Sequence, residues 1–537
     1  MKPRTTIRLF LVGCCAVAAA TGAAAQPLSP AERRTLAGEI EQSFTRQLLD
    51  RFFPRVIDQP LGGFRTSFSR DWQPTGPQDK MIVSQARHTW LPAKTRQLYP
   101  NRPHLAAAAR HGFAFLGGAM WDRTHGGFRT WVTRAGKPLA ADHSKTAYGN
   151  AFGIYALAAY YQTFGDTAAL ELAKRTFRWL ETHSHDPVHR GYYQNLEPDG
   201  TPAERGADGK INPELRYKDQ NSSIHLLEAF AELYRVWPDP LLGERLAEML
   251  VLIRDTIVTE RGNLTLFLTP DWQPVSYRDS TEAARKAHYS VDHVSPGHDI
   301  ETAYLLLEAS HALDSVPDAR TVAIAKRMVD HTLRTGWDET VGGFYERGYY
   351  LRGNDRITLL DDRKNWWAQA EGLNTLLLMA DTYPNDAMRY GEKFRKQWHY
   401  VQRYLIDSTY GGWYAGGLDK EPASQTGPKG HAWKAAYHEG RSLMNCLQRL
   451  RPDTVAPSLP TQLTLSQDRT ALRWKAARDD RHVVGYDVYR NGTRIGYTPL
   501  TFFPLPVAKP APGTTFRVIA RDAAGNPSPA AQLVPVE

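Results

Sequence analysis

The chain has 537 residues, far more than one small hydrophobic core needs, so we expect two or more domains. Its formal charge of +9 is a mild excess for this length, and it contains no Lys/Arg run typical of nucleic-acid binding. Past the N-terminus, no stretch approaches the roughly 20 apolar residues of a membrane-spanning helix. Nucleic-acid binding and a membrane span are therefore set aside.

Residues 1–25 are typical of an export signal. Three basic residues precede an apolar run that begins at Leu9, and the alanines at 23–25 form a small-residue cleavage site. Cys14 also lies in a sequence that resembles a lipoprotein box, but the apolar run before it is short, so lipid anchoring is the minor alternative. Cleavage leaves Cys446 as the one cysteine, so a large core rather than a disulfide must hold the fold. We expect a periplasmic or secreted protein.

Twelve amphipathic helical segments dominate residues 26–451. They lie at 31–52, 84–99, 103–120, 147–165, 167–184, 222–236, 239–258, 298–313, 318–335, 365–382, 385–406 and 434–450. An aspartate followed by a glycine turn recurs between them, with a spacing of roughly 65–70 residues. The copies are Asp58 with Gly62-Gly63-Phe64, Asp122 with Gly126-Gly127-Phe128, Asp186 with Gly191-Tyr192-Tyr193, Asp338 with Gly342-Gly343-Phe344, and Asp407 with Gly411-Gly412-Trp413. Arg261-Gly262-Asn263 falls in the one double gap, and we interpret it as a degenerate copy.

Six repeats of two helices each predict the fold class, a mainly α (α/α)6 barrel. One helix hairpin cannot bury its apolar stripe alone, so the hairpins must stack, and a closed ring of six leaves no exposed end. An open helical solenoid is the alternative, but it would need polar caps at both ends, which we do not find.

A linker marked by prolines at 452–460 precedes a different pattern. Residues 461–537 alternate in polarity as β-strands do, and Asn491-Gly492 is a strong hairpin signal. The pattern predicts a small all-β sandwich that resembles a fibronectin type III domain. We place no catalysis there, and we expect a spacer or a weak binding module that contacts a polysaccharide or the cell surface.

The stretch Gly297-His298-Asp299-Ile300-Glu301 predicts the start of a helix. Residues three apart share a helix face, so we expect the Glu301 carboxylate beside the His298 imidazole. There it would fix the tautomer and raise the basicity of a general base. A lone motif of this kind is more often an incidental ion pair, so its weight depends on the rest of the chain.

Comparable polar clusters begin every second helix. They are Gln85, Arg87 and Trp90; Tyr148; Asn221 and His225; Lys364, Trp366, Trp367, Gln369 and Glu371; and Trp433, Lys434, Tyr437, His438 and Arg441. Each has a good packing explanation when taken singly, since paired tryptophans are more often core residues. Alternate helices form the inner ring of such a barrel, so the clusters are predicted to converge at one mouth.

The clusters resemble motifs of the N-acylglucosamine 2-epimerase superfamily, and most closely those of the cellobiose 2-epimerases. The matching pieces are Gln85-Ala-Arg87, Lys145 with Tyr148-Gly-Asn-Ala-Phe152, Asn221 with His225-Leu-Leu-Glu228-Ala, Leu233-Tyr-Arg-Val-Trp-Pro-Asp239, Gly297-His-Asp-Ile-Glu301, Trp366-Trp367-Ala-Gln-Ala-Glu371, and Trp433-Lys434 with Tyr437-His438 and Arg441. The resemblance runs from about residue 35 to residue 450. It implies an (α/α)6 barrel that acts on the reducing end of a sugar without a metal or organic cofactor.

By position, the resemblance implies that His298 and His438 are the two acid/base residues, and that Arg87 and His225 hold the open-chain sugar near its carbonyl. The implied supporting and sugar-binding groups are Tyr148, Asn221, Glu301, Glu371, Arg441, Trp433, and Trp366 or Trp367. Two departures from the family stand out. Ser223 lies where members often carry a second histidine, and the segment 277–295, which leads straight to His298, is longer than expected. We interpret this segment as a lid or a limit on substrate length.

Such residues suit the removal of a proton from C2 of a sugar, which is acidic when C1 is an open aldehyde. A histidine near neutrality can take this proton, and Arg87 can stabilise the resulting enediolate. A second histidine on the opposite side of the pocket can return a proton to the other face. Our first hypothesis is an exported carbohydrate 2-epimerase that acts on the reducing-end glucose of a β-1,4-linked disaccharide such as cellobiose.

Three other functions remain as alternatives. An aldose–ketose isomerase acting on mannose or a related monosaccharide would return the proton to C1 instead. A glycoside hydrolase would need two carboxylates, whereas the clusters are richer in histidine. A carbohydrate-binding protein would leave two histidines on inner helices unexplained, and a metal site built from His225, His298 and Glu301 is ranked last. We expect a monomer whose partner is a small sugar.

Overall fold

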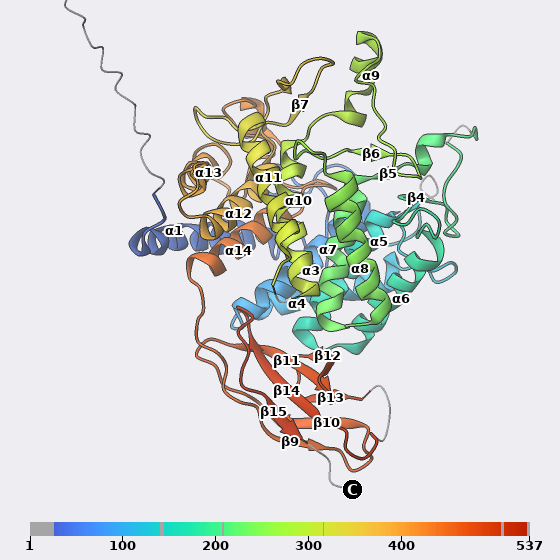
Figure 1. Cartoon of the computed structure of the whole chain (residues 1–537), viewed down its shortest axis with the longest axis vertical. Helices are drawn as coiled ribbons and strands as arrows, with labels where there is room; N and C mark the ends of the chain where they lie inside the picture. The colour runs from blue at the N-terminus through green and yellow to red at the C-terminus, as the bar shows by residue number, and fades with distance from the viewer. Residues whose placement is uncertain (1–25, 140–143, 207–208, 315, 506–509, 534–537) are drawn as a thin grey trace, which may run out of the picture.

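The computed structural model describes residues 26–139, 144–206, 209–314, 316–505 and 510–533. The predicted export signal, with Cys14, lies outside these residues. Within them, the chain forms a helical body followed by a small β-domain (Figure 1). None of the described helices combines the length and the hydropathy needed to cross a bilayer.

The helical body is an (α/α)6 barrel made of two rings. The inner ring consists of α3 (Ile82–Leu98), α5 (Ala147–Phe164), α7 (Gln220–Val236), α10 (Pro296–Leu313), α12 (Trp366–Thr382) and α14 (Tyr437–Leu450). The outer ring consists of α1 (Pro30–Gln42) continued by η1 (Ser43–Leu49) and α2 (Asp50–Phe52), α4 (Pro103–Phe115) with η2 (Leu116–Met120), α6 (Thr167–His183), α8 (Pro240–Leu252) with η4 (Ile253–Ile257), α11 (Ala319–Thr335) and α13 (Tyr390–Tyr404). Inner helices pack on one another in chain order, and α14 packs on α3, so the ring is closed. The barrel is confirmed, and the open solenoid is wrong.

The sequences of the helices explain which ring each one joins. α5 is buried at every position from Ala147 to Tyr161, as expected for a helix surrounded by others. α6 buries a single stripe that includes Leu170 and Phe177. Gly165 ends α5 in the left-handed conformation, at φ 68°, and Asp166 caps α6 by accepting from the Ala168 N–H at 2.9 Å.

The repeated aspartates anchor the inner helices. Each accepts from a buried lysine that precedes the next inner helix: Asp58 from Lys80 (3.1 Å), Asp122 from Lys145 (2.9 Å), Asp186 from Lys218 (2.8 Å), Asp338 from Lys364 (2.8 Å) and Asp407 from Lys429 (2.9 Å). In every copy an isolated β-bridge closes the glycine turn. The degenerate copy keeps this bridge, from Val258 to Leu264, which confirms its assignment. It has Thr259 in place of the aspartate and Val294 in place of the lysine. Both charges are replaced together, which leaves neither one buried without a partner.

Short two-stranded antiparallel sheets lie beside the starts of the inner helices. β1 (Lys80–Met81) pairs with β2 (Trp131–Val132), β3 (Lys145–Thr146) with β4 (Asn195–Leu196), β5 (Lys218–Asp219) with β6 (Phe267–Leu268), and β7 (Arg347–Tyr349) with β8 (Thr358–Asp361). The 3-10 helices η3 (Pro213–Arg216) and η5 (Pro422–Thr426) lie in loops. The long segment 277–295 contains α9 (Glu282–Asp292), and α9 and β7 project from the same end of the barrel (Figure 1).

The β-domain has two antiparallel sheets. One has the order β13 (Phe502–Pro504), β10 (Ala471–Lys475), β9 (Thr461–Leu465); the other has the order β12 (Thr493–Thr498), β11 (Val483–Arg490), β14 (Phe516–Asp522), β15 (Ala531–Leu533). Asn491 and Gly492 link β11 to β12 with φ values of 50° and 82°, which confirms the predicted hairpin. Trp474, Val488 and Val518 are part of the buried core of this domain.

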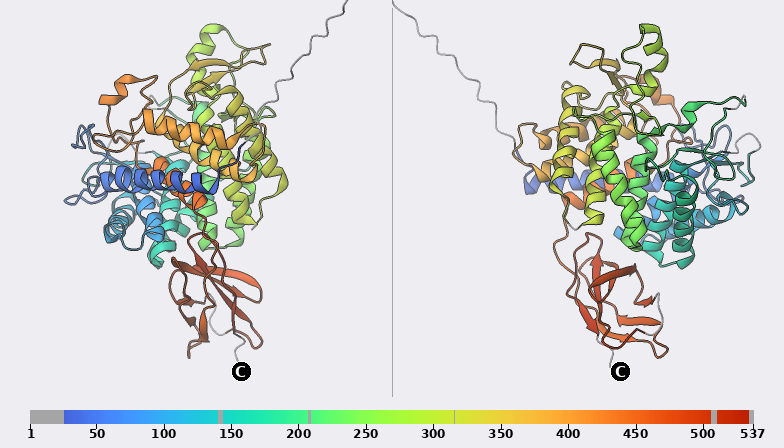
Figure 2. Two further views of the ribbon diagram at one scale, coloured as in Figure 1. Left: turned by 90° about the vertical axis from the view of Figure 1, so that its left-hand side faces the viewer. Right: turned by 45° about the vertical axis from the view of Figure 1, so that its right-hand side comes forward.

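The β-domain is docked on the end of the barrel opposite α9, and the views in Figures 1 and 2 agree on this placement. Tyr497 of β12 is 4% exposed and packs into the barrel core, where its carbonyl accepts from the Tyr161 hydroxyl at 2.9 Å. Arg494 donates to the main-chain carbonyls of Tyr234 and Arg235 at the end of α7. The β-domain is therefore packed directly against the barrel.

Candidate active site

The predicted polar residues begin the inner helices at two levels. The first turns carry Tyr148 on α5, Asn221 on α7, His298 on α10, Trp366 and Trp367 on α12, and His438 on α14. The next turn of the inner helices carries Arg87 on α3, His225 on α7, Glu301 on α10, Glu371 on α12 and Arg441 on α14. All six inner helices therefore contribute to one end of the barrel.

Arg441 is the centre of this cluster and is 2% exposed. It donates to Glu301 Oε1 at 2.6 Å, lies 2.7 Å from Glu371 Oε1, and also bonds Glu228 Oε1. Burial opposes the charge of Arg441, but these carboxylates outweigh it and raise the pKa of Arg441 well above its usual range. Burial likewise opposes the charge of Glu228, yet Arg441 and His225 lower the pKa of Glu228 to about 2. The cluster is a charged network held inside the protein.

Glu228 was not among the predicted site residues. Its carboxylate accepts from the Tyr437 hydroxyl at 2.5 Å and lies 2.9 Å from His225 Nδ1. Glu228 follows His225 by three residues, which is the spacing that drew attention to His298 and Glu301. The same rule applied to α7 would have found this pair.

His438 is backed by a carboxylate. Its Nδ1 lies 2.7 Å from Glu371 Oε1 and 3.9 Å from Glu301 Oε1. Burial, reinforced by the charge of Arg87, lowers the pKa of His438 well below its ordinary value, so the imidazole is neutral near pH 7. Because Nδ1 faces Glu371, Nε2 is the nitrogen left for chemistry.

His298 has a different partner from the one we predicted. Its Nδ1 lies 2.8 Å from Ser295 Oγ, whereas Glu301 bonds Arg441. The rule of three-residue spacing considers only residues of α10. Arg441 of α14 offers Glu301 a full positive charge, whereas His298 offers a neutral ring. Burial, helped by His293 and other nearby histidines, lowers the pKa of His298 to about 3, so this imidazole is neutral as well.

The two imidazoles meet at Trp367. The centroid of the Trp367 ring lies 4.6 Å from that of His298 and 5.7 Å from that of His438. In the inner ring, α12 lies between α10 and α14, so the histidines come from helices on either side of α12. The two helices are next-but-one neighbours in the ring, and the two imidazoles converge on one place.

Arg87 and Tyr148 form a hydrogen-bonding group nearby. Arg87 Nη2 donates to the Tyr148 hydroxyl at 3.1 Å, and Nη1 donates to the Trp433 carbonyl at 3.2 Å. The guanidinium lies 4.5 Å from the Phe152 ring centroid, and the Tyr148 ring lies 5.1 Å from the ring of His225. Burial raises the pKa of Tyr148 to about 12, so its hydroxyl keeps its proton. This group offers a fixed cation and a neutral donor.

The three predicted tryptophans are placed differently. Trp433 is 52% exposed and lies before α14, where its ring is open to a ligand. Trp366 is 6% exposed and packs 5.0 Å from Lys434 Nζ, whereas Trp367 contacts both imidazoles. Asn221 is partly exposed in the first turn of α7. Trp367, rather than Trp366, is therefore the tryptophan at the histidine pair.

One grouping in this cluster has the spacing of metal ligands. Among the described residues, ligand atoms of Glu301, Glu371 and His438 lie within 4.8 Å of one another. Arg441 bonds both carboxylates, so the counter-charge of this grouping is a guanidinium. The set considered from the sequence, with His225 and His298, differs from this grouping.

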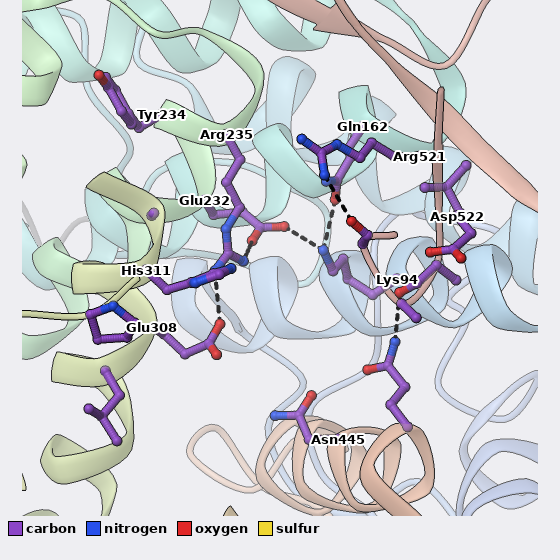
Figure 3. A pocket seen from close by; sticks show the side chains of 18 of the residues that line it. Lys94, Gln162, Glu232, Tyr234, Arg235, Glu308, His311, Asn445, Arg521 and Asp522 are labelled. Atoms are coloured by element: carbon purple, nitrogen blue, oxygen red, sulfur yellow. Dashed lines mark hydrogen bonds and ion pairs between the residues drawn. The ribbon is translucent and has the colours of Figure 1, made fainter. Parts of the chain in front are cut away.

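A cavity of about 1770 Å³ lies at the other end of the barrel, between the C-terminal halves of the inner helices and the β-domain (Figure 3). Lys94 donates to Gln162 at 2.7 Å and to Glu232 at 2.8 Å. Arg235 of α7 donates to Glu308 of α10 at 2.8 Å. Of the residues in the predicted clusters, all of which are described, Trp90 and Arg441 line this cavity. Trp90 therefore faces the end opposite to the predicted mouth, and Arg441 stands between the two ends.

The chain belongs to the N-acylglucosamine 2-epimerase family, whose model matches residues 62–439. It is 27% identical over 417 residues to a cellobiose 2-epimerase of Bacteroides fragilis, covering 76% of this chain and 98% of that one. It is 26% identical over 427 residues to a D-mannose isomerase of Thermobifida fusca, covering 78% and 95%. Both relatives are named as enzymes that isomerise sugars.

Solved structures give the same result. The cellobiose 2-epimerase of Spirochaeta thermophila matches with a TM-score of 0.67 and 28% identity, over 79% of this chain and 98% of that one. A D-mannose isomerase matches with a TM-score of 0.65 and 25% identity, over 76% and 97%. An α-mannanase of Bacteroides thetaiotaomicron matches at 0.50 with 12% identity, over 78% and 97%, which shows a shared fold alone.

Proposed function

We propose that this protein is a carbohydrate 2-epimerase that converts the reducing-end glucose of a cellobiose-type disaccharide to mannose. One observation carries the proposal: two neutral imidazoles, His298 and His438, contact the same Trp367 ring. The cellobiose 2-epimerases among the relatives support the choice of substrate.

The reaction needs an acid and a base at C2. With C1 open as an aldehyde, Nε2 of one imidazole removes the C2 proton, and the electron pair of the C–H bond moves toward the carbonyl oxygen to give an enediolate. Arg87 is the cation that stabilises this oxyanion. Both rings are neutral in the free protein, so the other imidazole first takes up a proton from solvent and then gives it to the opposite face of C2, which restores the aldehyde. The sugar leaves with C2 inverted, and exchange with solvent resets the two rings.

The carboxylates of the cluster argue against a glycoside hydrolase. Such an enzyme needs one carboxylic acid to protonate the leaving group and a second carboxylate that acts as base or nucleophile. Glu228, Glu301 and Glu371 all bond Arg441. Because the three carboxylates pair with this guanidinium, they do not supply the acid and the base or nucleophile of a hydrolase.

An aldose–ketose isomerase is the second candidate, favoured by the D-mannose isomerase among the relatives. The same base would remove the C2 proton, and return of a proton to C1 would give a ketose. The two functions therefore share residues and differ in where the second proton goes.

Product analysis by NMR after incubation with cellobiose, lactose or mannose in heavy water separates these functions. The epimerase predicts a reducing-end mannose that carries deuterium at C2. A ketose product would favour the isomerase, and free glucose from cellobiose would establish a hydrolase instead.

We further infer that the protein is exported and cleaved after Ala25, and that the β-domain has the fibronectin type III architecture and contacts polysaccharide. The basic and apolar character of residues 1–25 supports export. N-terminal sequencing of the secreted or periplasmic protein tests the cleavage, and retention on insoluble cellulose, compared with a chain that ends at 455, tests the contact. We also propose a monomer, which light scattering would check.

A further inference from the structure

Ser295 occupies the N-cap position of α10 but does not cap the helix. An N-cap serine usually accepts from a backbone N–H two or three residues further on, as Ser29 does for α1 by accepting from the Glu32 N–H at 3.3 Å. The Ser295 side chain makes no such bond, and its Oγ lies 2.8 Å from His298 Nδ1. The Ser295 hydroxyl therefore hydrogen-bonds the imidazole instead of capping the helix.

The neighbouring residues hold Ser295 in this place. Ser295 is 5% exposed, and Pro296 follows it at the first helical position, where the absence of an N–H is tolerated. A Cβ on Gly297 would lie 2.6 Å from the Trp367 ring, so glycine is what allows that ring close to the start of α10. Val294 exchanges two backbone hydrogen bonds with Gly348 of β7, at 2.8 and 3.0 Å. The hydroxyl is therefore presented from an anchored backbone.

A hydroxyl and a carboxylate act differently behind an imidazole. An ionised carboxylate can accept hydrogen bonds but cannot donate them, so Glu371 favours the His438 tautomer that carries its proton on Nδ1. A serine hydroxyl can accept or donate by rotating its proton. Ser295 is therefore compatible with either neutral tautomer of His298.

We propose that Ser295 is a positioning residue that lets neutral His298 exchange between its two tautomers. With the proton on Nδ1, which donates to Ser295 Oγ, Nε2 has a free lone pair and can take the C2 proton. With the proton on Nε2, Nδ1 accepts from the Ser295 hydroxyl, and Nε2 donates a hydrogen bond to a sugar oxygen. The exchange moves one proton between ring nitrogens through solvent, with no gain or loss of atoms. His438, held by Glu371, stays in the base tautomer.

This inference rests on the proposed function for its meaning, but one test of it does not need turnover. In ¹⁵N NMR of histidine-labelled full-length protein, His438 is expected to show one tautomer and His298 a mixture of both. Ser295→Asp should place a carboxylate behind His298 and collapse the mixture to the form with its proton on Nδ1. A single His298 tautomer that is the same in wild type and in Ser295→Asp would overturn the proposal.

Kinetics on cellobiose provide the second test. Ser295→Ala should lower kcat by about 10-fold, the effect of about 1.4 kcal/mol of lost positioning, while Ser295→Thr keeps the hydroxyl and retains activity. Ser295→Asp should also move the acid limb of the pH profile to higher pH, because a carboxylate favours the imidazolium. Ser29→Ala, which removes a true cap, is the control and should lower Tm with kcat unchanged.

Two kinetic results would defeat the idea. Ser295→Ala with the kcat and pH profile of the wild type would show that the hydroxyl is dispensable. A lower Tm with unchanged kcat, as in the control, would show an ordinary structural role. If the wild-type protein epimerises no sugar, the proposed function fails, while the ¹⁵N spectra still decide the tautomer question.

Discussion

The two ends of the barrel are built from the same six helices and use the same charged residue types differently. At the helix starts, Arg441 gathers three carboxylates beside two neutral imidazoles. At the helix ends, Lys94 pairs with Glu232, and Arg235 pairs with Glu232 and Glu308. At this far end two cations balance two carboxylates, within α7 and between helices. At the near end, formed by the helix starts, the charges lie beside the imidazoles. On the proposed function, the far-end network is structural and the near-end network serves the chemistry.

The large cavity does not lie at the end that holds the two imidazoles. The 1770 Å³ cavity lies at the far end, where the β-domain covers the helix ends. Helix polarity contributes to the difference in charge between the two ends of the barrel, because the N-terminal ends of helices favour anions and the C-terminal ends favour cations. Glu371 lies near the start of α12, and Arg494 of the β-domain binds the carbonyls that end α7.

The largest expected effect comes from the imidazoles. His298→Asn or His438→Asn should lower kcat on cellobiose by a factor of about 10² to 10⁴, because each removes a group that moves a proton. Thermal unfolding should change little. His311→Asn, which alters a histidine lining the far-end cavity, is the matched control and should retain full activity. Near-wild-type kcat in both near-end variants would contradict the assignment.

Replacing Arg441 should lower the free energy of unfolding, because its charge holds the carboxylates of the near end. Arg441→Met leaves buried carboxylates without their counter-charge, which should cost about 3–5 kcal/mol in the free energy of unfolding. Adding Glu371→Gln should recover part of this loss, because one of the uncompensated charges is then removed. Urea unfolding of the single and double variants measures both effects. A loss of less than about 1 kcal/mol would mean that the network is not what holds these residues.

The depressed pKa of His298 predicts how stability depends on pH. The unfolded chain binds a proton at this ring below about pH 6.5, whereas the folded protein does so only near pH 3. The free energy of unfolding should therefore fall as the pH drops from 6.5 toward 3, by up to about 1.4 kcal/mol per pH unit from this ring. His298→Gln should reduce the slope by that share. An unchanged slope would mean that burial does not keep this imidazole neutral.

The smallest expected effect lies at the far end. Arg494→Ala removes donors from the end of α7 and should destabilise the protein by about 1 kcal/mol, with kcat roughly unchanged. Arg473→Ala, at an exposed position of the same domain, is the control. A large loss of kcat in Arg494→Ala would show that the two ends are coupled through α7.

The sequence predicted the fold well because the repeat carries its own anchors. Each aspartate before a glycine turn pairs with a lysine that precedes an inner helix, so the periodicity reports a real contact. The docking of Tyr497 into the barrel was not predictable, because it depends on how two separately patterned domains meet.

The sequence predicted which residues cluster at this end of the barrel better than it predicted which of them contact one another. Spacing on one helix placed Glu301 on the correct face, but Arg441, distant in sequence, determines what Glu301 bonds. Ser295 was missed for a different reason: it lies three residues before His298 at the start of the same helix, and the spacing rule was applied only in the forward direction. Local rules describe which residues share a face, and they cannot rank partners that arrive from other helices.

The most direct test of the central claim is a crystal structure with cellobiitol, the open-chain alditol of cellobiose, bound to the full-length protein. We predict that C2 of the alditol lies between His298 Nε2 and His438 Nε2, with one ring on each face and Trp367 alongside. A sugar bound in the far-end cavity alone, or one that contacts a single imidazole, would contradict the account.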